Sequence, residues 1–512
     1  MPIPFSNIPA NWKQPLYWVE VDPSKAGRPI NRLAALLVGT MSSTGTGTPD
    51  IQVPIGRQMD ADALFGQGSE LARAFRAFFA NNFSQELWAL PLAEPTGGAA
   101  ASGTVTVAAA PTEAGTIHLY IAGDHVPVNV AAGMVVNDVA TAIADTINDD
   151  DDLPVTAAAA AAVVTLTAKW SGLTGNDITM RHNYFGTVGG EMLPPGLDLT
   201  YTPTNGLLAG GAGTPVMDTA IANLGEQEFE YVSMPYTDST SLLAWETEYG
   251  FSDAGRWGWM RQHFGHVFSA KRGAYGDLIT FGGTRNSGVV SVMGFELDSP
   301  SPSFEWSAAY TAKAGRALAN DPARPLQTLH MESIKPASSH MQFNLLELNT
   351  LAGYGIATQR TLSDHVPMIS RETTTYQVNS YGQGDDAYEL VTTLATLARL
   401  LRDQRQLITS TFPRHKLAND GTRFGPGAAV CTPKSIKAVL IADYRSHEFL
   451  GLVEDADAFK KNLIVERDPV DQNRVNVLYP PDLINQLRIF AVLAQFRLQY
   501  NRGVDMEIIG TV

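Results

Sequence analysis

Short apolar runs alternate with stretches of helical periodicity over residues 31–96 and again over 214–359. Continuous apolar runs are typical of strands buried on both faces, whereas helices carry apolar residues three or four positions apart. The predicted strands are 33–38, 86–92, 229–234, 266–270 and 289–295, and the predicted helices are 60–82, 241–249 and 306–320. Strands that alternate with helices favour a mostly parallel sheet covered on both faces, so we predict one discontinuous α/β domain over 31–96 and 214–359.

The pattern changes between residues 97 and 213. Gly, Ala, Thr and Val dominate this stretch, and its only basic residues are Lys169 and Arg181. The predicted strands are 104–109, 116–121, 125–130 and 163–170, with one predicted helix at 135–148. A glycine-rich end at 210–213 precedes the return of the α/β pattern. These features predict a mostly β module inserted into the α/β domain.

Residues 360–500 form the third predicted unit, an α+β C-terminal domain. Its first helix is predicted to begin at Asp385 or Asp386, either of which is a suitable N-cap, and to run to about Ile408. The apolar stripe of this helix is Leu390, Leu394, Leu397 and Leu401. A second helix is predicted at 433–444, and a hairpin is predicted from 461–467 and 474–479.

The end of this unit, residues 488–500, alternates between the two faces of an extended chain. Every even position from 490 is apolar, and the odd positions become polar from 495. The apolar positions are Phe490, Val492, Ala494, Phe496, Leu498 and Tyr500. Alternation with a period of two predicts a strand with one buried face.

The two ends of the chain are predicted to be arms. Residues 1–30 carry five prolines together with Trp12, Tyr17 and Trp18. Proline breaks helices and disordered tails are poor in aromatic residues, so we interpret this segment as an extended arm. Residues 501–512 contain Ile508 and Ile509. Pairing of this second arm with a partner's sheet and a frayed end both remain open.

Composition narrows the class of function. The net charge is −16 and the isoelectric point is near 5.1, which argues against wrapping a nucleic acid. The single cysteine, Cys431, excludes an intrachain disulfide and disfavours a cysteine-based zinc site. The N-terminal residues do not have the pattern of a signal peptide, and no apolar run is long enough to span a membrane. These features fit assembly in a reducing cytoplasm.

Candidate chemical motifs are weak. The loop 39–47 is rich in glycine but lacks the spacing and the lysine of a phosphate-binding loop. His263 and His266 are an HxxH pair interrupted by Gly265, and the acidic run 149–152 lacks the alternation of a calcium loop. We therefore predict no catalytic, cofactor-binding or metal site, and expect a building block and not an enzyme.

A local basic cluster stands out in this acidic chain. It consists of Arg414, His415, Lys416 and Arg423. A nucleic-acid patch is one interpretation, and a contact with an acidic surface of a neighbouring copy is the other. The overall charge favours the second, because like-charged subunits need local complementarity to associate in register.

Two runs, 412–422 (FPRHKLANDGT) and 478–488 (LYPPDLINQLR), resemble the C-terminal region of Mu-like contractile phage tail sheath proteins. Five more stretches resemble the same family, in matching order: 64–73 (LFGQGSELAR), 320–326 (NDPARPL), 355–358 (GIAT), 371–377 (RETTTYQ) and 451–455 (GLVED). The similarity is strongest over 320–500 and weakest in the inserted module.

This resemblance implies a structural subunit that stacks as hexameric rings around a tail tube and contracts to drive the tube through the host envelope. It implies homo-oligomers joined by terminal arms, and contacts with tail tube, baseplate and tail terminator proteins. Neither nucleic-acid binding nor membrane insertion is expected. The protein would be part of the virion and assemble in the host cytoplasm, with the inserted module facing outward.

Two alternatives stay open at this point. The first is the sheath of a phage-derived bacteriocin or injection system, which shares the mechanism. The second is an α/β enzyme whose site has no recognisable motif. The residues we expect to act in assembly are Trp12, Tyr17, Trp18, Arg414, His415, Lys416, Phe490, Val492, Phe496, Leu498, Ile508 and Ile509.

Overall fold

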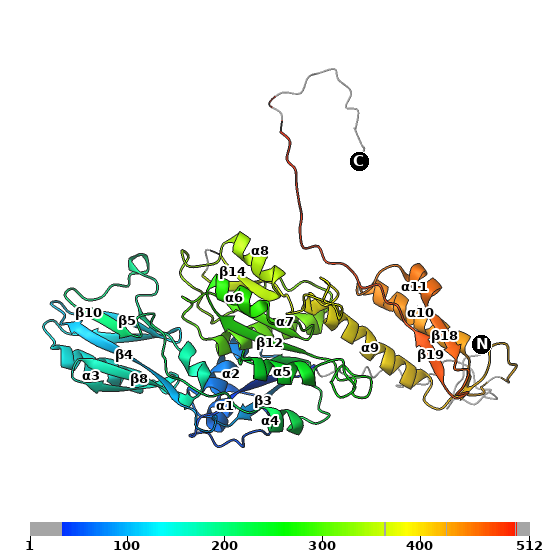
Figure 1. The fold of residues 1–512 in the computed structure, drawn as a ribbon, viewed down its shortest axis with the longest axis horizontal. Helices are drawn as coiled ribbons and strands as arrows, with labels where there is room; N and C mark the ends of the chain where they lie inside the picture. The colour runs from blue at the N-terminus through cyan, green and yellow to red at the C-terminus, as the bar shows by residue number, and fades with distance from the viewer. Residues whose placement is uncertain (1–32, 363–364, 426, 497, 499–512) are drawn as a thin grey trace, which may run out of the picture.

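A computed structural model describes residues 33–362, 365–425, 427–496 and 498 (Figure 1). Its largest sheet has the strand order β15-β14-β13-β12-β11-β1-β3-β2. The strands are β1 (Ala35–Thr40), β2 (Val53–Pro54), β3 (Leu87–Leu92), β11 (Tyr231–Ser233), β12 (His266–Arg272), β13 (Val290–Phe295), β14 (Ile356–Thr361) and β15 (Pro367–Arg371). The inner strands, from β14 to β3, are parallel, while β2 and β15 pair antiparallel at the two edges. The predicted mostly parallel sheet is therefore confirmed.

Both faces of this sheet are buried, which explains the continuous apolar runs of its strands. In β1, Ala35 and Leu37 face one core, and Leu36 and Val38 face another. The first core is shared with α1 (Gln58–Phe65), α2 (Glu70–Asn81) and α7 (Ser303–Asn320). The second is shared with α4 (Asp218–Asn223) and α5 (Ser239–Glu248). A smaller cluster joins α6 (Tyr275–Gly282) and α8 (Leu345–Gly353) to β14.

The single helix predicted at 60–82 is wrong, because the structure has two helices there. Gly66 and Gly68 separate α1 from α2 and both have positive φ values, +87° and +75°. A Cβ at Gly66 would lie 2.0 Å from the Ser42 hydroxyl, so the turn requires glycine. Ser69 then caps α2, where its hydroxyl accepts a hydrogen bond from the Ala72 backbone N–H.

Residues 100–202 form two further sheets, inserted in sequence between β3 and β11. One sheet has the order β10-β4-β8-β7 and the other β6-β5-β9, and they share a core with α3 (Val136–Asn148). The strands are β4 (Ala100–Ala109), β5 (Gly115–Ile121), β6 (Asp124–Val130), β7 (Val155–Ala160), β8 (Val163–Ser171), β9 (Met180–His182) and β10 (Asp198–Thr202). The Ala99 N–H donates to the Ala212 carbonyl at 3.0 Å, so the chain enters and leaves this module at one place.

The C-terminal unit is built on α9 (Val391–Thr411), which runs from the main sheet to the far end of the molecule (Figure 1). Around its distal end lie β16 (Lys416–Leu417), β17 (Val430–Cys431), α10 (Pro433–Phe449), α11 (Ala456–Asn462), β18 (Ile464–Arg467) and β19 (Val475–Leu478). Tyr444 and Phe459 stack at 3.7 Å between ring centroids in its core. The predicted hairpin is confirmed as β18 and β19.

Two expectations about this region need correction. The main sheet continues through β15 to Arg371, beyond the boundary expected at residue 359. The helix expected from Asp385 or Asp386 begins at Val391 instead, with Leu390 as its N-cap. Asp385 is engaged in a preceding turn, where it accepts hydrogen bonds from the Tyr376 hydroxyl and the Ala387 N–H.

The strand predicted at 488–500 is also wrong for the described residues, since 488–496 form no strand in the single chain. This red segment runs away from the folded body in Figure 1, and its side chains from Ile489 onward are exposed. Its period of two requires a neighbouring strand, and the described part of the same chain places none beside it.

Candidate functional site

The carboxyl edge of the parallel sheet is the first place to look for a ligand site. In open α/β sheets, ligands bind where the strand order reverses, and here that point lies between β1 and β11. The fully buried carboxylate of Glu70 fills this position. It accepts hydrogen bonds from the Thr40 backbone N–H at 3.2 Å and from the Tyr236 hydroxyl at 3.1 Å. Protein groups therefore occupy the place where a ligand would be held.

The inserted module closes the same edge. Asp177 of the module pairs with Arg272 at the end of β12 and accepts the backbone N–H of Ser303, at the start of α7. Arg181 pairs with Asp298 beside it. A cavity of about 340 Å³ remains between the module and the ends of β11 and β12. The arrangement fixes the module to the sheet.

Burial raises the pKa of Glu70 from its ordinary 4.5 to about 7, although hydrogen bonds from Thr40 and Tyr236 favour the charged form. The folded state then holds a proton that the unfolded state loses between about pH 4.5 and 7. The free energy of unfolding should therefore fall as pH rises through this interval, by about 3 kcal/mol. Glu70→Gln should flatten this dependence in denaturation of dispersed subunits at pH 5 and pH 8.

The exposed Glu113 provides the control for this test. Glu113→Gln should keep the pH profile of the wild type. If Glu70→Gln and the wild type lose stability in parallel between pH 5 and 8, Glu70 is not the group responsible.

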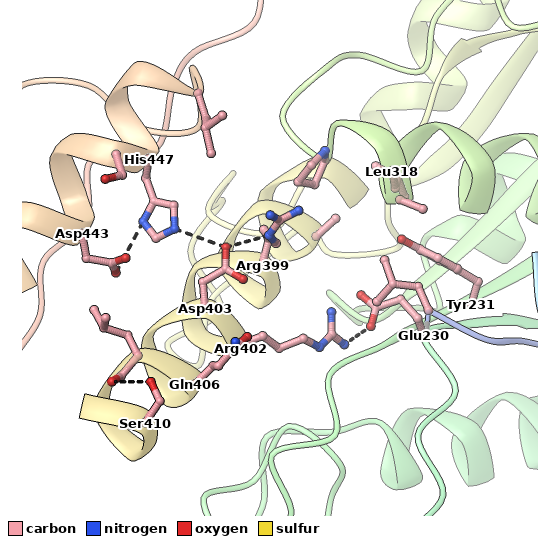
Figure 2. A pocket seen from close by; sticks show the side chains of 17 residues that line it. Glu230, Tyr231, Leu318, Arg399, Arg402, Asp403, Gln406, Ser410, Asp443 and His447 are labelled. Carbon is pink, nitrogen blue, oxygen red and sulfur yellow. Dashed lines mark hydrogen bonds and ion pairs between the residues drawn. The ribbon is translucent and has the colours of Figure 1, made fainter. Parts of the chain in front are cut away.

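A second cavity, of about 610 Å³, lies between the main sheet and the C-terminal unit (Figure 2). The buried ring of His447 on α10 lies between Asp403 of α9, at 3.3 Å, and Asp443, at 3.7 Å. Burial would raise the pKa of Asp403, but hydrogen bonds from His447 and Arg399 outweigh it and hold that pKa below its ordinary value. Burial raises the pKa of Asp443. The contact between His447 and Asp403 joins α10 to α9.

Arg402, one turn from Arg399, points the other way in Figure 2, toward Glu230 at the start of β11. It also donates to the Phe264 carbonyl at 2.9 Å. Burial lowers the pKa of Arg402 to about 10. The pairs Arg402–Glu230 and Asp403–His447 thus connect α9 to the start of β11 and to α10, which suits a structural joint between the sheet and the C-terminal unit.

The HxxH pair and the single cysteine do not come together in one site. His263 bonds Glu226 and Glu228 on the surface, at 2.8 and 3.0 Å. His266 is buried in β12, where burial lowers its pKa to about 3. Cys431 is a buried free thiol in β17. In the part of the chain that the structure describes, no helix is long and apolar enough to cross a membrane.

The predicted assembly residues fall into three groups. Arg414, His415 and Lys416 are exposed in the turn after α9 and at the start of β16, and Arg423 is exposed in the following loop. The second group is Phe490, Val492, Phe496 and Leu498, all exposed in the C-terminal segment. The third group, Trp12, Tyr17, Trp18, Ile508 and Ile509, lies outside the described residues. Their role in assembly stays a prediction.

Sequence reasoning missed the residue that fixes the start of the C-terminal segment. Arg488 forms a two-pronged ion pair with the fully buried Glu372, with a distance of 2.9 Å from Nη1 to Oε2. The two residues are 116 positions apart, and neither has a spacing that would reveal the pair. Gln486 adds a second attachment, since its amide donates to the Ala323 carbonyl at 2.6 Å.

Two family models and one curated relative match this chain. The phage tail sheath protein central domain matches residues 210–375, and the phage tail sheath C-terminal domain matches residues 383–497. The chain is 40% identical over 500 residues to the Mu-like prophage FluMu tail sheath protein of Haemophilus influenzae, covering 97% of this chain and 100% of that protein.

Among solved structures, the sheath tail protein of Desulfitobacterium hafniense is similar with a TM-score of 0.46 and 12% identity, covering 92% of this chain and all of that one. A chain of the anti-feeding prophage baseplate is similar with a TM-score of 0.48 and 12% identity, and the similarity covers 95% of this chain and 99% of that one. The conclusion rests on the family models and on the 40% identity over nearly the whole of both chains. This chain belongs to the Mu-like phage tail sheath family, and it is a structural tail protein and not an enzyme.

Proposed function

We propose that this subunit polymerises as stacked hexameric rings around a tail tube and contracts to drive the tube through the host envelope during genome delivery. The observation that carries the proposal is the exposed, mostly apolar segment 489–496, with the exposed Leu498 after it, attached to the folded body at Arg488. A contiguous apolar surface without cover is typical of a protein–protein contact. Its unpaired backbone suits strand addition to another subunit.

The anchor at Arg488 gives this segment a defined origin. Glu372 is fully buried, so its charge depends on the guanidinium of Arg488 for compensation. The segment therefore leaves the body from a fixed point, and its exposed residues 489–496 are placed to meet a neighbour. A fixed anchor followed by an exposed segment suits a connection between subunits that persists while the subunit bodies rotate during contraction.

The acceptor we propose is the hairpin β18–β19 of a neighbouring copy. A hairpin of two strands is marginally stable on its own and offers backbone groups along its edges. Ile464 at one end of β18 and Leu478 at the facing end of β19 are exposed, although both are large and apolar. An added strand carrying Phe490 and Val492 would supply the side chains that cover them.

The basic cluster Arg414, His415 and Lys416 is proposed to contact an acidic surface of a neighbour, in keeping with the net charge of −16. The arms 1–30 and 501–512 are proposed to take part in the same network. The inserted module is proposed to face outward, since it lies at the opposite end of the molecule from β18 and β19 (Figure 1). Its proposed place is the virion, with tail tube, baseplate and tail terminator proteins as partners after assembly in the host cytoplasm.

Negative-stain electron microscopy of the purified chain tests this proposal. Long hollow cylinders with helical striations are expected, either from the chain alone or after co-expression with a tail tube protein. Uniform monomers under both conditions would contradict it.

A further inference from the structure

We propose that His118, His125 and Glu191 of the inserted module form a binding site for a divalent transition-metal ion of the zinc type. One ring nitrogen from each histidine and one carboxylate oxygen lie within 4.8 Å of one another. The site is independent of the sheath assembly proposed above, and it lies in a different part of the fold from the two cavities.

The hairpin of β5 and β6 brings the two histidines together. His125 stands opposite Tyr120, and His118 is two positions before Tyr120, so all three side chains share one face of the hairpin. The His118 Nδ1 and the His125 Nε2 are 3.0 Å apart, and their rings are inclined by 10°. Two nitrogen ligands bound to one tetrahedral zinc, each at about 2.0–2.1 Å, lie roughly 3.3 Å apart. The two nitrogens therefore lie near the separation of two zinc ligands, and on binding the rings would turn so that both lone pairs point at the ion in place of their mutual hydrogen bond.

Glu191 is held in place by groups that are not ligands. One of its carboxylate oxygens accepts the Tyr120 hydroxyl at 2.5 Å, and the other accepts the Phe185 backbone N–H at 2.9 Å. Outer hydrogen bonds of this kind orient a metal ligand and are part of built metal sites. The carboxylate is buried, whereas His125 is exposed, so an ion has a route from solvent.

The ligand set selects the class of metal. Two imidazoles and one carboxylate suit zinc and its neighbours in the first transition row, whereas calcium and magnesium prefer oxygen ligands. An ion would link the hairpin of β5 and β6 to the loop 183–196, which contributes Glu191. This loop exposes Val188 and Met192 at the surface of the module, and bound metal would fix the position of that apolar surface.

Titration calorimetry of the full chain with ZnCl₂ tests the site. One zinc ion per chain is expected. His118→Ala and His125→Ala should each weaken binding by at least about 100-fold, and Tyr120→Phe, which removes an orienting hydrogen bond, by roughly 10–100-fold. His340→Ala is the matched control, because His340 is an exposed histidine remote in sequence from the cluster. The affinity of this variant for zinc should equal that of the wild type.

A second measurement covers the case in which an alanine variant fails to fold. Co²⁺ bound to the wild-type chain should give the intense visible absorption of a tetrahedral site, and ZnCl₂ should displace it. The proposal is overturned if no such absorption appears. It is equally overturned if folded His118→Ala and His125→Ala chains bind zinc as the wild type does.

Discussion

A subunit carrying both Phe490→Asp and Val492→Asp is expected to fold normally and to form no long cylinders. These side chains are 83% and 68% exposed, so the folded single chain makes little use of them. In the proposed assembly they are covered by a neighbour, and burying two unpaired carboxylates costs several kcal/mol. Because each 1.4 kcal/mol is a factor of ten, the concentration needed for assembly should rise by more than about 100-fold.

Pelleting and negative-stain microscopy over a range of protein concentrations measure this effect. Val188→Asp is the matched control, since Val188 is a fully exposed apolar residue in the module proposed to face outward. It should assemble at the wild-type concentration. Cylinders of the double variant at that same concentration would refute the role of this segment, and thermal unfolding would show whether the variant is folded.

Local patterns in the sequence were sufficient to predict most strands of the main sheet. β1, β3, β12 and β13 are buried on both faces, so each appears as a continuous apolar run with little dependence on distant residues. β4 and β8 of the module alternate between buried and half-buried positions, and this pattern is also visible along the chain. The alanine-rich β7 was missed, because alanine does not favour strands and pairing with β8 decides its structure.

Contacts between distant residues could not be predicted in this way. Glu372 and Arg488 are brought together by the course of the whole chain, and so are His118, His125 and Glu191. The segment 488–498 illustrates a different limit. Its alternation indicates a face suited to burial, but it does not say which molecule supplies the cover. The strand was therefore predicted for the single chain, although its proposed partner is a second copy.

The largest expected loss of stability within one subunit comes from Arg73→Leu. Arg73 is 2% exposed and joins α2 to α7 and to the module: its guanidinium lies 2.5 Å from Glu305, 2.7 Å from Asp124 and 2.8 Å from the Asp152 carbonyl. Burial raises the pKa of Glu305 even with Arg73 beside it. Without Arg73 this carboxylate has lost its closest cation, and breaking such a buried pair costs about 3–5 kcal/mol.

Chemical denaturation of dispersed subunits at pH 7.5 measures that loss. Arg76→Leu is the control, because Arg76 also pairs with Asp124 but is 36% exposed, and exposed ion pairs contribute about 0–1 kcal/mol. The double variant Arg73→Leu with Glu305→Leu should recover much of the stability that Arg73→Leu loses, because it removes both buried charges. Arg76 still forms an ion pair with Asp124 in this variant. If the two single substitutions instead add, Arg73 and Glu305 act independently, and the cost of Arg73→Leu comes from its bonds to Asp124 and to the Asp152 carbonyl of the module.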